Sequence, residues 1–264
     1  MPTTSSWLFP PATREAQFDE DWSFVAKKQE HCDAGDPADA QKGDWWDHKG
    51  YDPEHRLVVC VVPGARNSEN AEETVAQFKR RTGGRDMDLI TSDEHRPYKE
   101  AILQAYGVEA TTTPGGLPVR APHKVAPPGL CYATVHKSRR LGQVVKVVIR
   151  LVFGTAALLA GALKASAVSR SVNVSFLERQ HLTDRHRNAR KRRKTYCFSK
   201  SWEAHEAATY FTLYSYNFCW PVRTLRARSP DQPWRERTPA MAAGLTDHVW
   251  SLEEWLKFPA VKLH

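Results

Sequence analysis

Three strand-like segments open this chain, and a helix, a fourth strand and a second helix come directly after them. Residues 18–28 carry aromatic side chains between charged flanks, and residues 43–51 follow as a second strand. Residues 56–62 form the β-branched run RLVVCVV, which is typical of a third strand. We expect these three strands to pair in antiparallel fashion. The order predicts an α/β fold in which a mixed sheet is flanked by helices.

The helix and strand that follow are well marked. The helix at 69–82 has acidic residues at its start and basic residues at its end, which suits the helix dipole, and Ser68 is expected to cap it. A fourth strand at 87–91 brings Asp93 to its carboxyl-terminal tip, directly before a helix at 97–106. Strand tips in mixed sheets are common places for functional sites.

The second half of the chain predicts further elements. Residues 111–129 are rich in Pro and Gly, and two apolar runs after them flank the sequence SRRLG as a β-hairpin. Helices are expected at 155–165 and 202–216, and Ser251 opens a capping box for a short docked helix at 252–258. The predicted organisation is an N-terminal tail at 1–17, an α/β domain at 18–219 with an inserted hairpin at 108–152, and a C-terminal linker with its docked helix at 220–264.

Most of the excess charge lies in one segment. The chain carries a formal net charge of +8, and residues 179–194 contain eight Lys or Arg and one Asp, a local charge of +7. Such a segment suits an acidic partner, and its position on a patterned helix beside aromatic residues favours nucleic acid over a membrane surface. A solvated helix face and a nuclear targeting signal are the alternatives.

The cysteine content and the apolar segments indicate the cellular compartment. The five cysteines are scattered without a C-x-x-C pair, so we expect free thiols in a reducing, cytoplasmic compartment. Zinc bound by His31, Cys32 and the nearby Asp44, His48 and His55 is a weak alternative, because paired ligand spacing is missing. The start of the chain has no signal-peptide pattern, and the apolar stretch at 151–168 is interrupted by Lys164. We therefore expect no membrane association.

Three acidic residues lie on a predicted strand, at a predicted strand tip and on a predicted helix, and their side chains can converge in the fold. They are Asp19, Asp93 and Glu178. Carboxylates of this kind hold two metal ions roughly 3.5–4 Å apart that act on a phosphodiester, and hard oxygen ligands select Mg²⁺ or Mn²⁺. Other interpretations stay open. Strand alternation puts Asp21 on the same face as Asp19, Asp93 could cap the next helix, and Glu178 could pair with Arg179 or neighbouring basic residues.

The sequence around these acids resembles the insertion sequence one family of Asp-Asp-Glu transposases. The motif FDEDWSFVAKK is similar to that family's first catalytic strand, and ITSDEHRPY is similar to its second motif. The segment LER, followed later by RKTYCFSKSWEAHE, resembles the family's Glu-Arg helix and its continuation. The resemblance spans residues 18–258 and assigns Asp19, Asp93 and Glu178 as the catalytic and metal-binding triad.

The resemblance implies a fold, a metal cofactor, a reaction and a set of DNA contacts. It implies a ribonuclease-H-like core, two Mg²⁺ or Mn²⁺ ions, and cleavage of element ends with strand transfer in DNA transposition. Element ends and target DNA would be the partners, the enzyme would be nucleoid-associated, and members commonly act as dimers. Basic residues on and after the Glu178 helix would contact the DNA backbone: Arg179, His181, Arg185, Arg187, Arg190, Lys191, Arg192, Arg193 and Lys194.

The chain also departs from the family pattern. Members usually carry an N-terminal zinc-binding and helix-turn-helix segment, whereas about eighteen residues precede the core here. We therefore expect a truncated catalytic part, or a downstream frame whose DNA-recognition partner is encoded upstream. The stretch 145–165 lacks most of the charges of an exposed hairpin and helix. A ribonuclease-H-like nuclease and an inactive nucleic-acid-binding remnant are the alternative functions.

Overall fold

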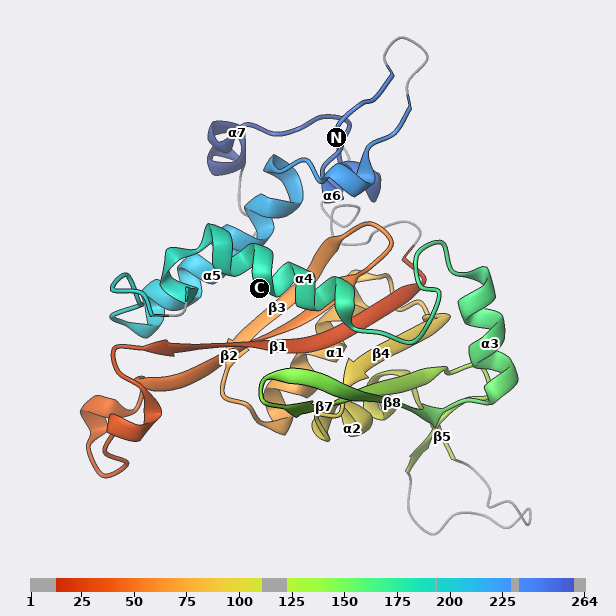
Figure 1. Cartoon of the computed structure of the whole chain (residues 1–264), viewed down its shortest axis with the longest axis horizontal. Helices are drawn as coiled ribbons and strands as arrows, with labels where there is room; N and C mark the ends of the chain where they lie inside the picture. Colours follow the sequence, from red (N-terminus) through yellow and green to blue (C-terminus); the bar gives the residue numbers. More distant parts are fainter. Residues whose placement is uncertain (1–12, 111–122, 193, 229–232, 259–264) are drawn as a thin grey trace.

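A mixed six-stranded sheet flanked by helices forms the centre of the computed structural model, which describes residues 13–110, 123–192, 194–228 and 233–258 (Figure 1). The strand order is β3-β2-β1-β4-β7-β8. The α/β class and the flanked mixed sheet predicted from the sequence are confirmed, and the arrangement is compatible with a ribonuclease-H-like fold. The strands are β1 (Glu15–Val25), β2 (Gly43–Asp52), β3 (Leu57–Gly64), β4 (Leu89–Asp93), β7 (Tyr132–Arg140) and β8 (Gln143–Phe153).

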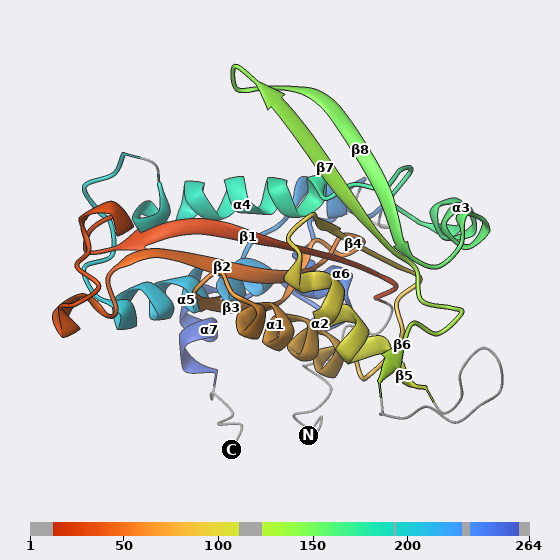
Figure 2. The same ribbon diagram turned by 90° about the horizontal axis from the view of Figure 1, so that it is seen from below.

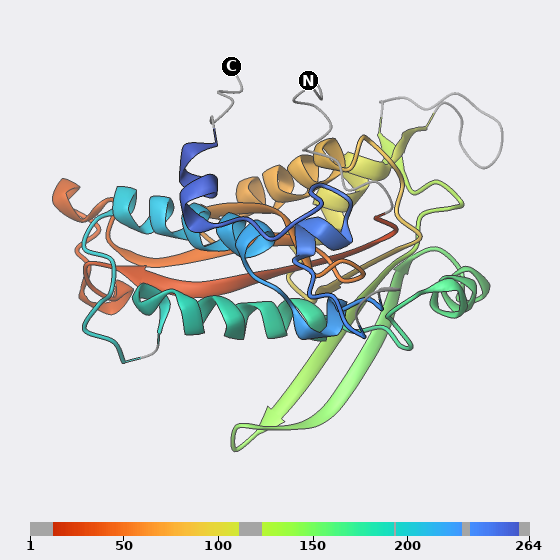
Figure 3. The ribbon, with the colours of Figure 1, turned by 90° about the horizontal axis from the view of Figure 1, so that it is seen from above.

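Helices α1 (Ser68–Arg81) and α2 (Pro97–Tyr106) cover one face of the sheet, and α4 (Ser175–Arg187) lies across the other (Figures 2 and 3). The core under α1 and α2 contains the fully buried side chains of Phe18, Phe78 and Tyr98. Helix α5 (Trp202–Cys219) packs against the edge strand β3. None of the helices in the described ranges has the length and apolar character that crossing a lipid bilayer requires.

The first helix keeps its predicted position, but its cap differs. Asn67, not Ser68, is the N-cap, and its side chain accepts a hydrogen bond from the Asn70 backbone amide at 3.0 Å. Both residue types favour this position, so the sequence alone did not separate them. At the other end of the chain the predicted cap is confirmed, because Ser251 accepts from the Glu254 backbone amide at 3.0 Å at the start of α7 (Leu252–Lys257).

The central strands fix the relative positions of the two aspartates. Strand β1 begins at Glu15, earlier than predicted, and runs antiparallel to β2 but parallel to β4. Phe18 pairs with Ser92 in the β1–β4 register. Asp19 and Asp93 each come one residue later, so they lie side by side on neighbouring strands, at the point where β4 ends and β1 continues.

The predicted hairpin is part of the main sheet. Strands β7 and β8 pair with each other, and β7 also pairs in parallel with β4, so 108–152 is not wholly an insertion as predicted. The far end of this hairpin projects beyond the body of the molecule (Figures 2 and 3). A small pair, β5 (Val108–Glu109) with β6 (Lys124–Val125), precedes it, and the intervening 111–122 lie outside the described residues.

The basic segment is not one continuous helix. Helix α4 ends at Arg187, where Asn188 leaves the helical conformation, and a short 3₁₀ turn, η4 (Ala189–Lys191), follows. Asn188 caps this turn by accepting from the Arg190 backbone amide at 3.1 Å.

Helix α3 (Ala156–Ala165) begins after Thr155, which accepts from the Leu158 backbone amide at 3.1 Å. The short helices η2 (Gln29–His31), η3 (Pro37–Asp39), η5 (Arg223–Leu225) and α6 (Pro239–Ala242) complete the described elements.

Candidate active site

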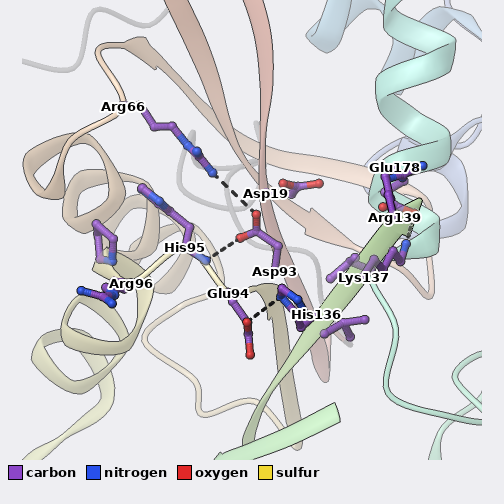
Figure 4. A pocket seen from close by; sticks show the side chains of 13 residues that line it. Asp19, Arg66, Asp93, Glu94, His95, Arg96, His136, Lys137, Arg139 and Glu178 are labelled. Atoms are coloured by element: carbon purple, nitrogen blue, oxygen red, sulfur yellow. Dashed lines mark hydrogen bonds and ion pairs between the residues drawn. The ribbon is translucent and has the colours of Figure 1, made fainter. Parts of the chain in front are cut away.

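Three carboxylates converge where β1 and β4 lie side by side. One oxygen each of Asp19, Glu20 and Asp93 lies within 4.8 Å of the other two. Asp19 and Asp93 line a pocket of about 590 Å³, to which α4 contributes Glu178 and β7 contributes Lys137 (Figure 4). The structure therefore brings all three predicted triad residues to one pocket. Beside Asp19 and Asp93 lies Glu20, which is not among the predicted site residues.

Asp19 has no Lys or Arg partner that would stabilise its ionised form among the described residues. In the described part of the chain its carboxylate forms no ion pair with Lys or Arg; the nearest basic side chain is His181, whose Nδ1 lies 3.7 Å from Oδ2. Burial, with the adjacent charges of Asp93 and Glu20, raises the pKa of Asp19 well above its usual 3.8. Burial and nearby cations hold the pKa of His181 well below 6.5, so its imidazole is neutral at pH 7.

Glu20 is almost fully buried and has one strong partner. Arg66 lies 3.2 Å from its Oε2, and two histidines, His48 and His95, lie 3.7 Å from Oε1. Burial and the charge of Asp93 nevertheless raise the pKa of Glu20. A glutamate next to the strand-borne aspartate was the only sequence signal for this residue.

Asp93 is the last residue of β4 and does not cap α2. Its Oδ1 accepts a hydrogen bond from the His95 backbone amide at 3.0 Å, and Arg66 lies 3.7 Å from Oδ2. The residue at the N-cap of α2 is Arg96, which makes no capping bond with its side chain. The capping alternative is therefore wrong for the helix itself, and a third of the Asp93 side chain stays open toward the pocket.

Glu178 faces the two aspartates from α4 but pairs with a cation. Its Oε2 lies 2.5 Å from the Nζ of Lys137, a residue of β7 (Figure 4). It is outside the tight carboxylate cluster, yet its charge contributes to the raised pKa of Asp19. The predicted alternative, a pair with Arg179, is replaced by this pair across the pocket.

Asp21 does not compete for the pocket. It is fully buried beneath α4, where Arg185 contacts its Oδ1 and the Nζ of Lys49 lies 3.6 Å from Oδ2. The predicted common face of Asp19 and Asp21 is confirmed, because both contact α4, at His181 and Arg185 respectively. Asp21 joins a second cluster, which we call the buried ion network: Asp21, Asp47, Asp184, Lys49, Arg185, Lys191 and His205.

Lys191 is the centre of the buried ion network. Its Nζ lies 2.6 Å from Asp47 and 2.9 Å from Asp184, and the residue is 4% exposed. Lys49 is also 2.9 Å from Asp184. Burial alone would raise the pKa values of Asp47 and Asp184, but Lys191 and the other cations outweigh it and hold both below 3.8.

The predicted DNA-binding residues therefore separate into two groups. Lys191 and His181 are buried, so the prediction that they contact phosphates is corrected. Arg185 pairs with Asp21, and the Arg187 guanidinium lies 3.3 Å from the centre of the Trp220 ring, so both serve packing. Arg193 lies outside the described residues. The residues that remain open to solvent are Arg179, Arg192 and Lys194, with Arg190 half-buried.

The carboxylate cluster suits a divalent cation. Its ligands are hard oxygen atoms, which Mg²⁺ and Mn²⁺ prefer, and it carries three acids with only Arg66 close to two of them. Among the described residues it is the one acidic, histidine or cysteine group with suitable spacing, so the zinc alternative gains no support. In comparisons with known proteins, no family model matches this sequence and no curated protein matches it.

Proposed function

We propose that this chain is a Mg²⁺- or Mn²⁺-dependent DNA transposase that uses Asp19, Asp93 and Glu178 in a ribonuclease-H-like core. The observation that carries the proposal is the convergence of the three carboxylates on one pocket from β1, β4 and α4. The pairing of β1, antiparallel to β2 and parallel to β4, supports the fold that the resemblance implies. Enzymes that break phosphodiesters commonly place two metal ions between such carboxylates.

The protein's own groups prepare the pocket for this chemistry. Asp19 and Asp93 would hold the metal ions with Glu178, and Glu20 would add negative charge beside them. Bound there, divalent ions activate a water or 3′-hydroxyl and stabilise the leaving oxygen of a phosphodiester. Lys137 holds the Glu178 carboxylate at the rim, and its ammonium also suits a nearby phosphate.

Exposed cations outside the pocket support a nucleic-acid substrate. Arg179 follows Glu178 on α4, and Arg192 and Lys194 follow the 3₁₀ turn. They would contact phosphates of element ends and target DNA, whereas the buried cations of the same segment stabilise the fold. We further propose a nucleoid-associated cytoplasmic enzyme that acts as a homo-oligomer.

The test compares cleavage of labelled duplex DNA by the wild type, Asp93→Asn and Glu178→Gln, with Mg²⁺ or Mn²⁺. A matched control is Asp88→Asn, since the side chain of Asp88 is 55% exposed and lies outside the pocket. We expect metal-dependent nicks and joined strands that both pocket variants lose and the control keeps. Nicks without joined strands would indicate a nuclease. Binding without chemistry in all four proteins would indicate an inactive remnant.

A further inference from the structure

The hairpin of β7 and β8 carries charge of one sign only. Its charged residues are five Lys or Arg, and the sequence contains no Asp or Glu between Glu109 and Glu178. A stretch this long without a carboxylate cannot neutralise itself. Positive potential of this kind attracts a polyanion. The five residues are Lys137, Arg139, Arg140, Lys146 and Arg150.

Two of these cations are already paired, and three are not. Lys137 pairs with Glu178, and Arg150 lies 2.6 Å from Glu94. Arg139, Arg140 and Lys146 are exposed, and none of them forms an ion pair with a described carboxylate. The unpaired charge therefore lies toward the projecting end of the hairpin.

The hairpin is continuous with the pocket. Lys137 and Arg139 line the pocket together with Asp19, Asp93 and Glu178 (Figure 4). From Lys137 to Arg140 the strand rises about 10 Å at about 3.3 Å per residue, which matches about three nucleotides at about 3.4 Å of axial rise each. A DNA strand whose reacting phosphate lies in the pocket can therefore pass along the basic end of the hairpin.

We propose that the β7–β8 hairpin is a DNA-binding arm in which Arg139, Arg140 and Lys146 contact the phosphate backbone a few nucleotides from the reacting bond. This inference rests on the proposed function and adds to it a second DNA contact surface, separate from the exposed residues of 179–194. The projection of the hairpin from the body leaves its basic end open to a long partner (Figure 2).

A second copy of the chain is the alternative binding partner of the β7–β8 hairpin. Strand β8 is an edge strand, and Val145, Val147 and Ile149 are 46–61% exposed along one of its faces. Edge strands of this kind can pair with another chain. Pairing of two β8 strands would, however, bring the basic residues of both hairpins together, and Lys146 has no carboxylate partner among the described residues. Like charges on paired strands are destabilising, so the charge pattern favours DNA.

The test measures the salt dependence of DNA binding by the full chain, with Ca²⁺ in place of Mg²⁺. The arm variant carries Arg139→Gln, Arg140→Gln and Lys146→Gln. Because each phosphate contact contributes about 0.9 to the log–log slope, we expect the slope to become shallower by about 2–3. The control variant carries Lys28→Gln, Lys99→Gln and Lys257→Gln, three exposed lysines away from the hairpin. It loses the same charge and should keep the slope within about one.

The outcomes separate this proposal from the proposed function. An arm variant with an unchanged slope overturns the arm, even if metal-dependent cleavage is intact. If the arm variant has a shallower slope while the wild type cleaves nothing, the arm is supported as a binding surface and the catalytic proposal is removed. A fall in oligomeric mass of the arm variant with an unchanged slope would identify a second copy as the occupant. The charge-conserving variant Arg139→Lys, Arg140→Lys should bind as the wild type does, which excludes misfolding as the cause.

Discussion

Asp19 and Asp21 lie two positions apart on β1, yet they belong to two clusters of three acidic residues whose electrostatics differ. The carboxylate cluster at the pocket contains Asp19, Glu20 and Asp93, with Arg66 near two of them and no Lys or Arg paired with Asp19 among the described residues. The buried ion network holds Asp21, Asp47 and Asp184, and Lys49, Lys191 and Arg185 match them one for one.

The pKa shifts follow from this difference. Burial and like charges raise the pKa of Asp19, while cations lower the pKa values of Asp47 and Asp184 despite burial. Asp21 lies between the two cases, because burial raises its pKa although Lys49 and Arg185 oppose the shift. The network thus satisfies its own charges and stabilises the packing of β1, β2 and α4. The pocket retains negative charge that an external cation can neutralise, which is a common property of functional sites.

Removing the central cation of the network should have the largest effect. Lys191→Ala leaves Asp47 and Asp184 without their shared partner in a buried position. We expect a loss of about 3–5 kcal/mol in the free energy of unfolding, measured by urea denaturation. The exposed neighbour provides the control, and Lys194→Ala should change stability by less than about 0.5 kcal/mol. Equal effects of the two variants would mean that the network contributes no stability.

Metal binding should distinguish the two clusters at nearby positions of β1. Ligand binding to the folded state stabilises it by about 2.7 kcal/mol at a hundredfold excess over Kd. We therefore expect Mn²⁺ to raise the melting temperature of the wild type and not of Asp19→Asn. Asp21→Asn should melt lower without metal, since Asn cannot balance Lys49 and Arg185, but should keep the rise with Mn²⁺. A rise in Asp19→Asn equal to that of the wild type would exclude the pocket as the metal site.

The pH dependence of stability should have opposite signs at Asp19 and at Asp184. The folded-state pKa of Asp19 is raised, so the protein loses stability as pH rises above 3.8, by about 1.4 kcal/mol for each pH unit until the folded-state pKa is passed. In EDTA, Asp19→Asn should exceed the wild type in stability at neutral pH and equal it below pH 3.8. The folded-state pKa of Asp184 is lowered, so the stability it contributes is present above 3.8 and lost as pH falls further. Urea denaturation at several pH values measures both effects, and a constant difference between Asp19→Asn and the wild type would contradict the assignment.

The sequence predicted the elements better than it predicted the charge partners. Helices with clear caps and alternating strands have local causes, so α2 was found at 97–106 and α3 within one residue. The convergence of Asp19 and Asp93 also followed from strand order. The roles of the basic residues could not be predicted, because Lys191 and Arg192 are neighbours in sequence yet one is buried and the other exposed. Lys191 is buried where it contacts Asp47 of β2, a strand far away in the chain.

Strand β2 contains a run of charged residues that indicates buried ion pairs, although their partners were not predicted. The run Asp47-His48-Lys49 lies in a central strand, where charged side chains are rarely buried unless paired. Its partners, Asp184 and Lys191, lie on α4 and in the following turn and are more than 130 residues away in sequence. Pairing over such a distance depends on the three-dimensional fold, and one sequence does not reveal it.

The smallest expected effect on stability is at the rim of the pocket, where an ion pair lies beside the carboxylate cluster. Lys137 and Glu178 form an ion pair like those of the network, but their side chains are 24% and 39% exposed. Solvent screens such pairs, so Lys137→Gln should change stability by less than about 1 kcal/mol. It should nevertheless tighten Mn²⁺ binding, because Glu178 is then free to turn toward Asp19 and one positive charge is removed.

A double-mutant cycle separates these two causes. If release of Glu178 is responsible, Lys137→Gln should tighten Mn²⁺ binding in the wild type, as measured by titration calorimetry, and have little effect in a Glu178→Gln background. If the lost charge alone is responsible, both backgrounds should respond equally. Unchanged binding in both would mean that Glu178 belongs to a structural ion pair and that the pocket binds metal through Asp19, Glu20 and Asp93 alone. Glu178 would then resemble the acids of the buried ion network, which are paired with cations.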